Sequence, residues 1–321
     1  MHKILVSIPV EESHKARLRE ICPDGEFTYV PVDSATRDEA RDAEVILGNV
    51  NPAFLKDSPN LRFVQLNSAG THGFTDPGAL PEGTLLANAS GAYGLAISEH
   101  MLALVFSIMK KLPAYRDLQR EHKWVDLGPV APIWGSKTLV VGCGDIGGEF
   151  AKKMHALGSS VTGIRRHAVK ADYLDNVGTM EDIYKFLPEA DVIAASLPET
   201  PDTKKIFNNE FFAKVKPGAF FLNVGRGTAV DQAALIRALE DGRLAAAALE
   251  VADPEPLPAD DPIWDAPNVI ITPHISGGYH LNETRERIFD LAAKNLAHYL
   301  AGEPIESAVD FATGYRKFTG K

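Results

Sequence analysis

The stretch LVVGCGDIGG, residues 139–148, decides the fold of this chain. Gly142, Gly144 and Gly147 follow the spacing G-x-G-x-x-G, after an apolar run and before the helix-like segment EFAKKMHAL. In a dinucleotide-binding unit the first glycine permits the tight turn, the second lets the backbone approach a pyrophosphate, and the third lets the helix pack on the strand. The helix N-terminus adds free N–H groups and partial positive charge. We therefore expect a nucleotide-binding turn here, the alternative being a tight turn without a ligand.

The next apolar run, SSVTGIR, ends in two arginines, Arg165 and Arg166. The residue about 20 positions after the first glycine is usually an acid that binds the ribose 2′-hydroxyl. Arg165 stands there instead, and guanidinium groups bind phosphate through paired, charge-assisted hydrogen bonds. We therefore expect NADP(H) to be preferred, with NAD(H) as the second option. Arg165 is the expected direct contact, because Arg166 points to the other face of the strand. The alternative is that both arginines only face solvent.

The composition is that of a soluble globular protein, with 45% hydrophobic and 24% charged residues. A length of 321 residues favours two domains. The net charge of -10 argues against a nucleic-acid partner, which would require a basic surface. The two cysteines, Cys22 and Cys143, form neither a metal-ligand spacing nor a disulfide framework, so we expect no metal site and a cytoplasmic location. Cys143 lies near a helix N-terminus, which can lower a thiol pKa, but we expect a small space-filling residue.

No membrane partner is expected either. The N-terminal apolar run is too short for a signal peptide and is followed at once by acids. Glu99 and His100 interrupt the most apolar long stretch, residues 94–112, which leaves too few apolar residues for a membrane span. This stretch fits a buried helix better.

Short apolar runs alternate with helical patterns along the whole chain, which predicts parallel sheets covered by helices. The first expected strands are KILVSI, AEVILGN and LRFVQLN, and one long helix is expected from about Ala96 to Arg120. Six further strands follow, as a full Rossmann sheet requires: TLVVGCG, SSVTGIR, DVIAASLP, AFFLNVG, LAAAALEV and NVIITPH. A last helix, from about Glu283 to Leu300, is stopped by AGEP. We expect a discontinuous substrate domain over residues 1–97 and 283–321, and a dinucleotide-binding domain over 98–282.

Three later stretches carry residues suited to chemistry: FFLNVGRGTAVD (220–231), ALEVADPEPLP (248–258) and VIITPHISGG (269–278). Together with the NSAG loop, GAYGLAISEH and the glycine turn, in this order, they resemble the D-isomer-specific 2-hydroxyacid dehydrogenases over nearly the whole chain. The resemblance implies two Rossmann-like domains, the substrate domain being flavodoxin-like, with a cleft between them. It also implies a homodimer.

The resemblance gives three residues catalytic roles. Arg226, in a glycine-flanked loop after a strand, is expected to bind the substrate carboxylate and polarise the carbonyl, for which a rigid charged fork is suited. His274 is expected to protonate the carbonyl oxygen during reduction and to act as the base in the reverse direction. Glu255 is expected to bond to the imidazole and fix its orientation. Packing of the histidine in its loop, or a purely cofactor-binding arginine, are the alternatives for each residue alone.

Further residues are expected around substrate and cofactor. Backbone N–H groups of Ala69 and Gly70 are expected to hold the substrate carboxylate, with Asn49 and Tyr93 near the substrate. The expected cofactor-binding residues are Gly142, Gly144, Asp145, Ile146, Gly147, Arg165, Arg166, Ser196, Leu197, Pro198, Val224, Gly225 and Glu250. Glu250 stands where the family commonly has Asp at the nicotinamide end, and His72 where it often has Asp in the substrate loop.

The expected activity is the NADPH-dependent reduction of a 2-oxo acid to a D-2-hydroxy acid. The residues do not decide among glyoxylate, hydroxypyruvate, pyruvate and bulkier 2-oxo acids. A dinucleotide-sensing adaptor of the same fold is the alternative from another class, and a dehydrogenase of another small acid is a third reading. The complete set of Arg226, Glu255 and His274 favours an enzyme.

Overall fold

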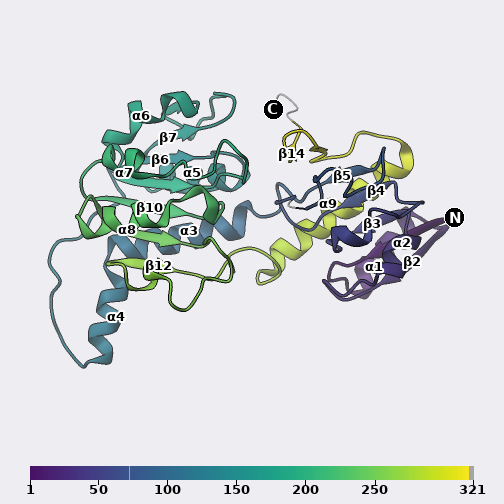
Figure 1. Ribbon diagram of the computed structural model, residues 1–321, viewed down its shortest axis with the longest axis horizontal. Coiled ribbons are helices and arrows are strands. Elements are labelled where there is room, and N and C mark those ends of the chain that lie inside the picture. Colours follow the sequence, from purple (N-terminus) through teal and green to yellow (C-terminus); the bar gives the residue numbers. More distant parts are fainter. Residues whose placement is uncertain (72, 318–321) are drawn as a thin grey trace. The chain divides into compact units, whose positions relative to one another are not determined.

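The computed structural model describes residues 1–71 and 73–317, which divide into two compact units. The first unit comprises Met1–Tyr93 and Gly278–Lys321, and the second comprises Gly94–Gly277. The sequence alone places these boundaries at 97/98 and 282/283. Both units are α/β structures built on parallel strands (Figure 1).

The first unit contains a five-stranded parallel sheet in the order β2-β1-β3-β4-β5, which is the flavodoxin-like order. Its strands are β1 (His2–Val6), β2 (Gly25–Tyr29), β3 (Val45–Leu47), β4 (Phe63–Gln65) and β5 (Leu85–Ala87). The three strands expected in this region are confirmed as β1, β3 and β4. Two strands escape sequence analysis, and both are edge strands of this sheet: β2 is half-exposed, and β5 begins with an exposed leucine.

Three helices accompany this sheet: α1 (Glu12–Ile21), α2 (Arg37–Asp42) and α9 (Asn282–Ala301). Helix α1 packs on α9, where the rings of His14 and Phe289 stack with centroids 4.1 Å apart. Helix α9 begins and ends within one residue of the expected bounds, and it stops at Gly302, whose φ of 69° is left-handed. After it, β13 (Val309–Asp310) and β14 (Tyr315–Arg316) form a small antiparallel ribbon.

The second unit contains a seven-stranded parallel sheet in the order β12-β11-β10-β9-β6-β7-β8. Its strands are β6 (Lys137–Val141), β7 (Ser160–Ile164), β8 (Asn176–Gly178), β9 (Val192–Ala195), β10 (Ala219–Asn223), β11 (Leu244–Leu249) and β12 (Val269–Ile271). All six expected strands are confirmed, and β8 is a short additional edge strand. The order is that of the Rossmann fold extended by one strand, with the reversal between β6 and β9.

The helices of the second unit are α3 (Gly94–Met109), α4 (Leu112–Arg120), α5 (Asp145–Ala156), α6 (Ile183–Phe186), α7 (Asn209–Ala213) and α8 (Gln232–Glu240). Helix α3 contacts α5 and the strands β10, β11 and β12. The expectation of one continuous helix from Ala96 to Arg120 is wrong. The chain breaks at Lys111, whose φ of 55° is left-handed, and Pro113 then starts a new helix. Single turns of 3₁₀ helix lie at Pro52–Phe54, Met180–Asp182, Leu187–Glu189, Gly227–Ala229 and Pro262–Asp265.

The core of the second unit is apolar on both sides of the sheet. Phe207, Phe211, Phe212 and Phe221 pack edge to face between α7 and β10. Cys143 is also buried, and burial raises the pKa of its thiol to about 11, which fits the space-filling role. No helix within residues 1–71 and 73–317 is long and apolar enough to cross a membrane.

Candidate active site

The glycine turn lies at the carboxyl end of β6, at the point where the strand order reverses. A Cβ on Gly147 would lie 2.4 Å from the Gly142 carbonyl oxygen, and one on Gly142 would lie 2.8 Å from the Ser196 carbonyl oxygen. The Ser196 hydroxyl donates to the Gly142 carbonyl oxygen at 2.7 Å. Only glycine therefore lets β6, β9 and the start of α5 pack this closely. The first turn of α5 lies at the carboxyl ends of the strands, which is the edge where folds of this kind bind ligands. This cradle fits the pyrophosphate of a dinucleotide.

The other expected cofactor residues follow neighbouring strands at the same edge of the sheet. Gly144 is the N-cap residue of α5, and the helix opens with Asp145, Ile146 and Gly147. The remaining positions follow β9 and β10: Leu197, Pro198, Val224 and Gly225. The carboxyl ends of parallel strands meet at one edge, so these residues line a common rim.

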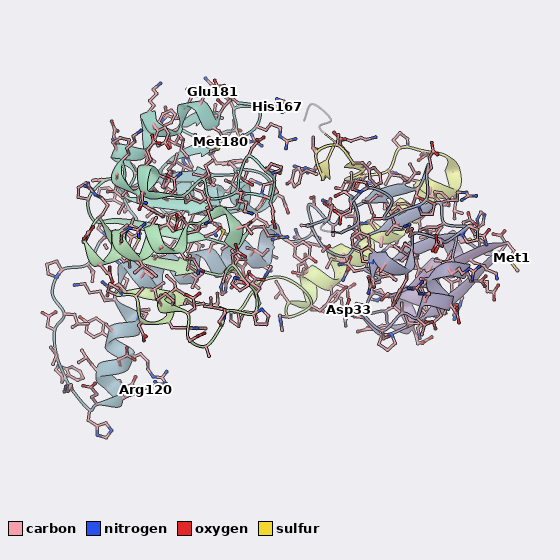
Figure 2. All side chains as sticks on the ribbon, viewed as in Figure 1. Met1, Asp33, Arg120, His167, Met180 and Glu181 are labelled. Atoms are coloured by element: carbon pink, nitrogen blue, oxygen red, sulfur yellow. The ribbon has the colours of Figure 1, made fainter. Side chains whose placement is uncertain are left out.

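Arg165 and Arg166 follow β7 directly, next to the glycine turn in the sheet order. Arg165 is half-buried, and its Nη1 donates to the Val169 carbonyl oxygen at 2.9 Å. Arg166 is exposed, and so is His167, which is labelled in Figure 2. Neither arginine forms an ion pair with a carboxylate in the part of the chain that the structure describes. The strand end is therefore positively charged and can receive an anionic group.

The Arg226 loop is held by the side chain of Asn223, the buried last residue of β10. Its Oδ1 accepts from the Gly225 N–H at 3.0 Å, and its Nδ2 donates to the Arg226 carbonyl oxygen at 3.0 Å. A Cβ on Gly227 would lie 1.9 Å from the Ala252 carbonyl oxygen, so the glycine after the arginine lets two loops touch. The half-buried Arg226 is thus presented by a rigid loop. Sequence reasoning assigned no role to Asn223.

His274 follows β12, and its ring contacts Glu255, which follows β11. His274 Nδ1 lies 2.8 Å from Glu255 Oε2, while Glu255 Oε1 accepts from the Ala252 N–H at 3.0 Å. His274 Nε2 has no hydrogen-bond partner among the described residues, and 46% of the side chain is exposed. The pair therefore offers one ring nitrogen to a ligand while a carboxylate fixes the other.

Glu250, at the end of β11, is 1% exposed and accepts three hydrogen bonds from within the chain. Its partners are the His100 Nε2, the Thr272 hydroxyl and the Ser276 N–H. Burial alone would raise the pKa of this carboxyl, but the hydrogen bonds outweigh that effect and lower the pKa to about 2. A carboxylate offers about four acceptor positions, so roughly one is left for a cofactor. The contacts to His100 and Thr272 were not anticipated from the sequence.

In the first unit, the loop after β4 is shaped by two asparagines. Asn49 and Asn67 bond reciprocally, each side-chain oxygen accepting from the other's backbone N–H at 2.9 and 3.1 Å. The Tyr93 hydroxyl donates to the Asn67 carbonyl oxygen. The backbone N–H groups of Ala69 and Gly70 have no acceptor among residues 1–71 and 73–317. This loop therefore presents two free donors, as a carboxylate site requires; His72 lies outside the described residues.

Tyr279 also belongs to this loop, although sequence reasoning assigned it no role. Its hydroxyl accepts from Asn67 Nδ2 at 2.6 Å, and burial raises the pKa of the phenol to about 12. The tyrosine is therefore a neutral hydrogen-bond partner that fixes the asparagine amide.

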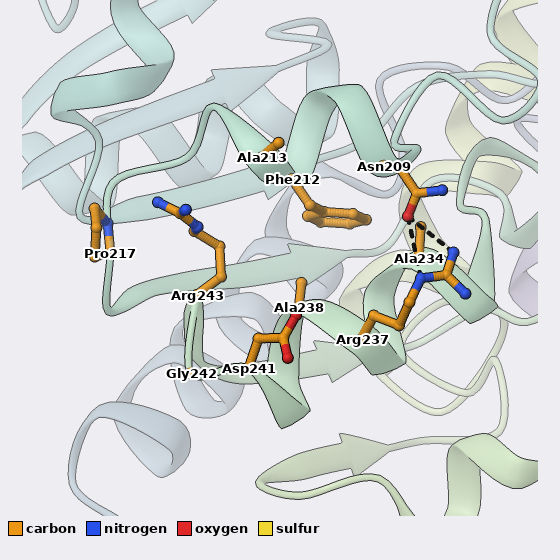
Figure 3. Close-up of a pocket in the computed structure, with 10 residues that line it drawn as sticks. All are labelled: Asn209, Phe212, Ala213, Pro217, Ala234, Arg237, Ala238, Asp241, Gly242 and Arg243. Carbon is orange, nitrogen blue, oxygen red and sulfur yellow. Dashed lines mark hydrogen bonds between the residues drawn. The ribbon is translucent and has the colours of Figure 1, made fainter.

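A hollow of about 490 Å³ lies elsewhere on the second unit, between α7 and α8 (Figure 3). Its lining includes Phe212, Pro217, Arg237 and Arg243. Pro217 precedes β10 and Arg243 precedes β11, so this hollow lies at the amino ends of the strands. It is thus at the opposite edge of the sheet from Arg226 and His274. Within the described ranges, no group of three or more His, Cys, Asp and Glu side chains is arranged to hold a metal ion.

Comparison with known proteins shows the family to which this chain belongs. Residues 102–276 match the family model for the NAD-binding domain of D-isomer-specific 2-hydroxyacid dehydrogenases. Glyoxylate/hydroxypyruvate reductase B of Escherichia coli is 33% identical over 281 residues, which cover 84% of this chain and 85% of that protein.

Two solved structures are similar over almost their full length. A D-isomer-specific 2-hydroxyacid dehydrogenase family protein from Aeromonas salmonicida matches with a TM-score of 0.84 at 29% identity, covering 97% of this chain and 99% of that chain. An NADPH-dependent glyoxylate/hydroxypyruvate reductase from Sinorhizobium meliloti, in complex with NADP and sulfate, matches with a TM-score of 0.83 at 25% identity, covering 98% and 100%. The chain belongs to the D-isomer-specific 2-hydroxyacid dehydrogenase family, and its second unit contains an NAD(P)-binding domain.

Proposed function

We propose that the protein reduces a small 2-oxo acid to a D-2-hydroxy acid with NADPH, with glyoxylate and hydroxypyruvate as the first candidate substrates. The observation that carries the proposal is the His274–Glu255 pair, with Nδ1 bonded to the carboxylate at 2.8 Å and Nε2 free among the described residues. Arg226, Glu255 and His274 follow β10, β11 and β12, which are neighbours in the sheet. An acid, its carboxylate partner and a cation thus share one edge.

In this proposal each residue has a defined task. The bound nicotinamide supplies the hydride. His274 donates the Nε2 proton to the substrate carbonyl oxygen, and in the reverse direction it removes the proton from the hydroxyl. Glu255 accepts the hydrogen on Nδ1 and so fixes the orientation of the ring, because its carboxylate faces that nitrogen. Arg226 binds the substrate carboxylate and polarises the carbonyl through its fixed fork of donors.

The substrate carboxylate is proposed to receive further hydrogen bonds from the N–H groups of Ala69 and Gly70. Support comes from the reciprocal Asn49–Asn67 bonds and the Tyr93 hydroxyl, which hold the loop before any ligand binds. A preorganised loop spares the ordering cost of binding.

NADP(H) is the proposed cofactor, with NAD(H) as the weaker alternative. Arg165 and Arg166, which form no ion pair with a carboxylate among residues 1–71 and 73–317, stand where an acid would otherwise meet the ribose 2′-hydroxyl. The similar Sinorhizobium meliloti enzyme is NADPH-dependent. Glu250 is proposed to lie at the nicotinamide end.

We further propose a cytoplasmic homodimer. In Figure 1, α4 and the segment after it extend away from the sheet of the second unit. Large apolar side chains are exposed in this region: Leu112, Trp124, Val125, Val130 and Trp134. A second copy would cover them. Both cysteines are free, as a reducing compartment allows.

The test is to follow the absorbance of NADPH and of NADH separately with glyoxylate, hydroxypyruvate, pyruvate, 2-oxoisovalerate and phenylpyruvate. Faster oxidation of NADPH with one of these acids is the expected result. Preference for NADH would refute the role of Arg165 but leave the catalytic residues standing. Tight binding of NADPH without turnover of any acid would instead favour a dinucleotide-sensing protein.

A further inference from the structure

The carboxylate of Glu250 spans the catalytic histidine loop from both sides. Oε2 accepts from the Thr272 hydroxyl, two residues before His274, and Oε1 accepts from the Ser276 N–H, two residues after it, at 2.5 Å. The main-chain oxygen of Glu250 also accepts from the His274 N–H at 2.9 Å. Glu250, the residue directly after β11, therefore holds the beginning, middle and end of the loop.

The loop needs such support because His274 has a φ of 51°. A residue with a Cβ is strained in this backbone region, and it stays there only when its surroundings fix it. His274 is not glycine, so three hydrogen bonds to Glu250 supply the fixing. The loop conformation in turn sets the direction of the imidazole.

Helix α3 contributes His100, whose ring lies next to the buried Glu250 carboxylate. His100 Nε2 lies 3.2 Å from Glu250 Oε2 and 3.1 Å from the Thr272 hydroxyl oxygen. Because Glu250 is ionised and offers only acceptors, Nε2 must carry a hydrogen. A buried carboxylate is tolerated only when its acceptor positions are filled, so His100 completes the set that Thr272 and Ser276 begin.

We propose that Glu250 and His100 are positioning residues that hold His274 in its left-handed turn, and that the length of the glutamate is required to reach both Thr272 and Ser276. An aspartate is one methylene shorter and cannot hold the two sides of this loop with the same backbone. The inference rests on the proposed function in one respect, the assignment of His274 as the acid. The positioning of the loop is a structural statement that is measurable without turnover.

The experiment compares Glu250→Gln, Glu250→Asp, His100→Phe and His100→Gln in the full chain. Glu240→Gln, at an exposed position of α8, is the matched control. Amide hydrogen exchange of the peptide covering residues 270–280 reports the loop, fluorescence titration reports NADPH affinity, and steady-state rates report kcat and KM. The thermal midpoint shows whether each variant is folded.

Glu250→Gln replaces one carboxylate oxygen, which accepts hydrogen bonds, by an amide N–H₂ group. This group would face other hydrogen-bond donors of the loop and of His100. The loss of a charge-assisted hydrogen bond of about 1.5–3 kcal/mol corresponds to a change of about 10- to 100-fold in an equilibrium or rate constant. Amide exchange in the 270–280 peptide should therefore become faster by about that factor, and kcat should fall by about the same factor. Glu250→Asp is expected to show the same faster exchange and lower kcat, because the shorter side chain cannot reach both Thr272 and Ser276. His100→Gln keeps an N–H donor and therefore retains more activity and protection than His100→Phe.

The opposite pattern overturns the proposal. Unchanged exchange in the 270–280 peptide, combined with a large loss of NADPH affinity, would make Glu250 a cofactor contact only. If His100→Gln and His100→Phe showed equal exchange rates and equal kcat, His100 would not be a positioning residue for the His274 loop. If the wild-type protein shows no reductase activity, the proposed function fails, but accelerated exchange in Glu250→Gln would still establish the positioning of the loop. If a glutamate variant is unfolded, the two His100 variants decide.

Discussion

Replacing Arg165 by serine should weaken NADPH binding selectively. The side chain is half-buried, and one of its five N–H donors is used by the Val169 carbonyl oxygen. The remaining donors can form one or two charge-assisted hydrogen bonds to a 2′-phosphate, and a single such bond contributes about 1.5–3 kcal/mol. The KM for NADPH should therefore rise by about 10- to 100-fold. The KM for NADH should stay nearly constant, because NADH has no 2′-phosphate.

The assay is the initial rate of cofactor oxidation at saturating 2-oxo acid, with NADPH and NADH each varied. Arg166→Ser should have a smaller effect, because the exposed guanidinium is more strongly screened by salt. Arg243→Ser, in the hollow at the opposite edge of the sheet, is the control and should change neither KM. An unchanged KM for NADPH in Arg165→Ser, or an equal rise for both cofactors, would rule out a contact between Arg165 and the 2′-phosphate.

Four further outcomes are expected. His274→Asn should lower kcat by about 10²–10⁴-fold with little change in NADPH affinity, measured by steady-state kinetics and titration, because it removes the general acid. Arg226→Lys should raise the KM for the 2-oxo acid by about 10- to 100-fold, because a lysine cannot replace the bidentate fork. Gly227→Ala should lower the free energy of unfolding in urea by about 1–3 kcal/mol, because its Cβ would overlap the Ala252 carbonyl oxygen. The pKa of Glu250 is lowered from 4.5 to about 2, so the ionised side chain should stabilise the fold by roughly 3 kcal/mol above about pH 4.5. This contribution should be lost as the pH falls toward 2. The difference in the free energy of unfolding between wild type and Glu250→Gln, measured in urea, should therefore shrink from pH 7 to pH 3.

Sequence reasoning reached most of the second unit because its strands are continuous apolar runs, and buried parallel strands are of this kind. It missed β2 because an edge strand is half-exposed, and β8 because that edge strand contains only one apolar residue, Val177. The break at Lys111 does have a signal in the sequence, because Pro113 interrupts the helical pattern two residues later.

The candidate site was likewise predictable only in part. Glycines and charged residues at strand ends were recognisable, since motif spacing reflects local backbone needs. The supporting contacts were not, because they join residues far apart in the chain. Asn49 and Asn67 are 18 positions apart, and His100 and Thr272 are 172 apart. No local pattern predicts such pairs, which form only when the fold brings their elements together.

The most direct test of the proposed reaction is the fate of the hydride. The protein would be incubated with NADPH carrying deuterium at C4 of the nicotinamide and with glyoxylate or hydroxypyruvate, and the product analysed by mass spectrometry and, for the chiral product, by chiral chromatography. Deuterium is expected on the carbon that bears the new hydroxyl, in a product of D configuration, and the amount of labelled product formed in the same time should fall by about 10²–10⁴-fold when His274 is replaced by asparagine. Product of L configuration, or no labelled 2-hydroxy acid from the wild-type protein with any acid of the panel, would contradict it.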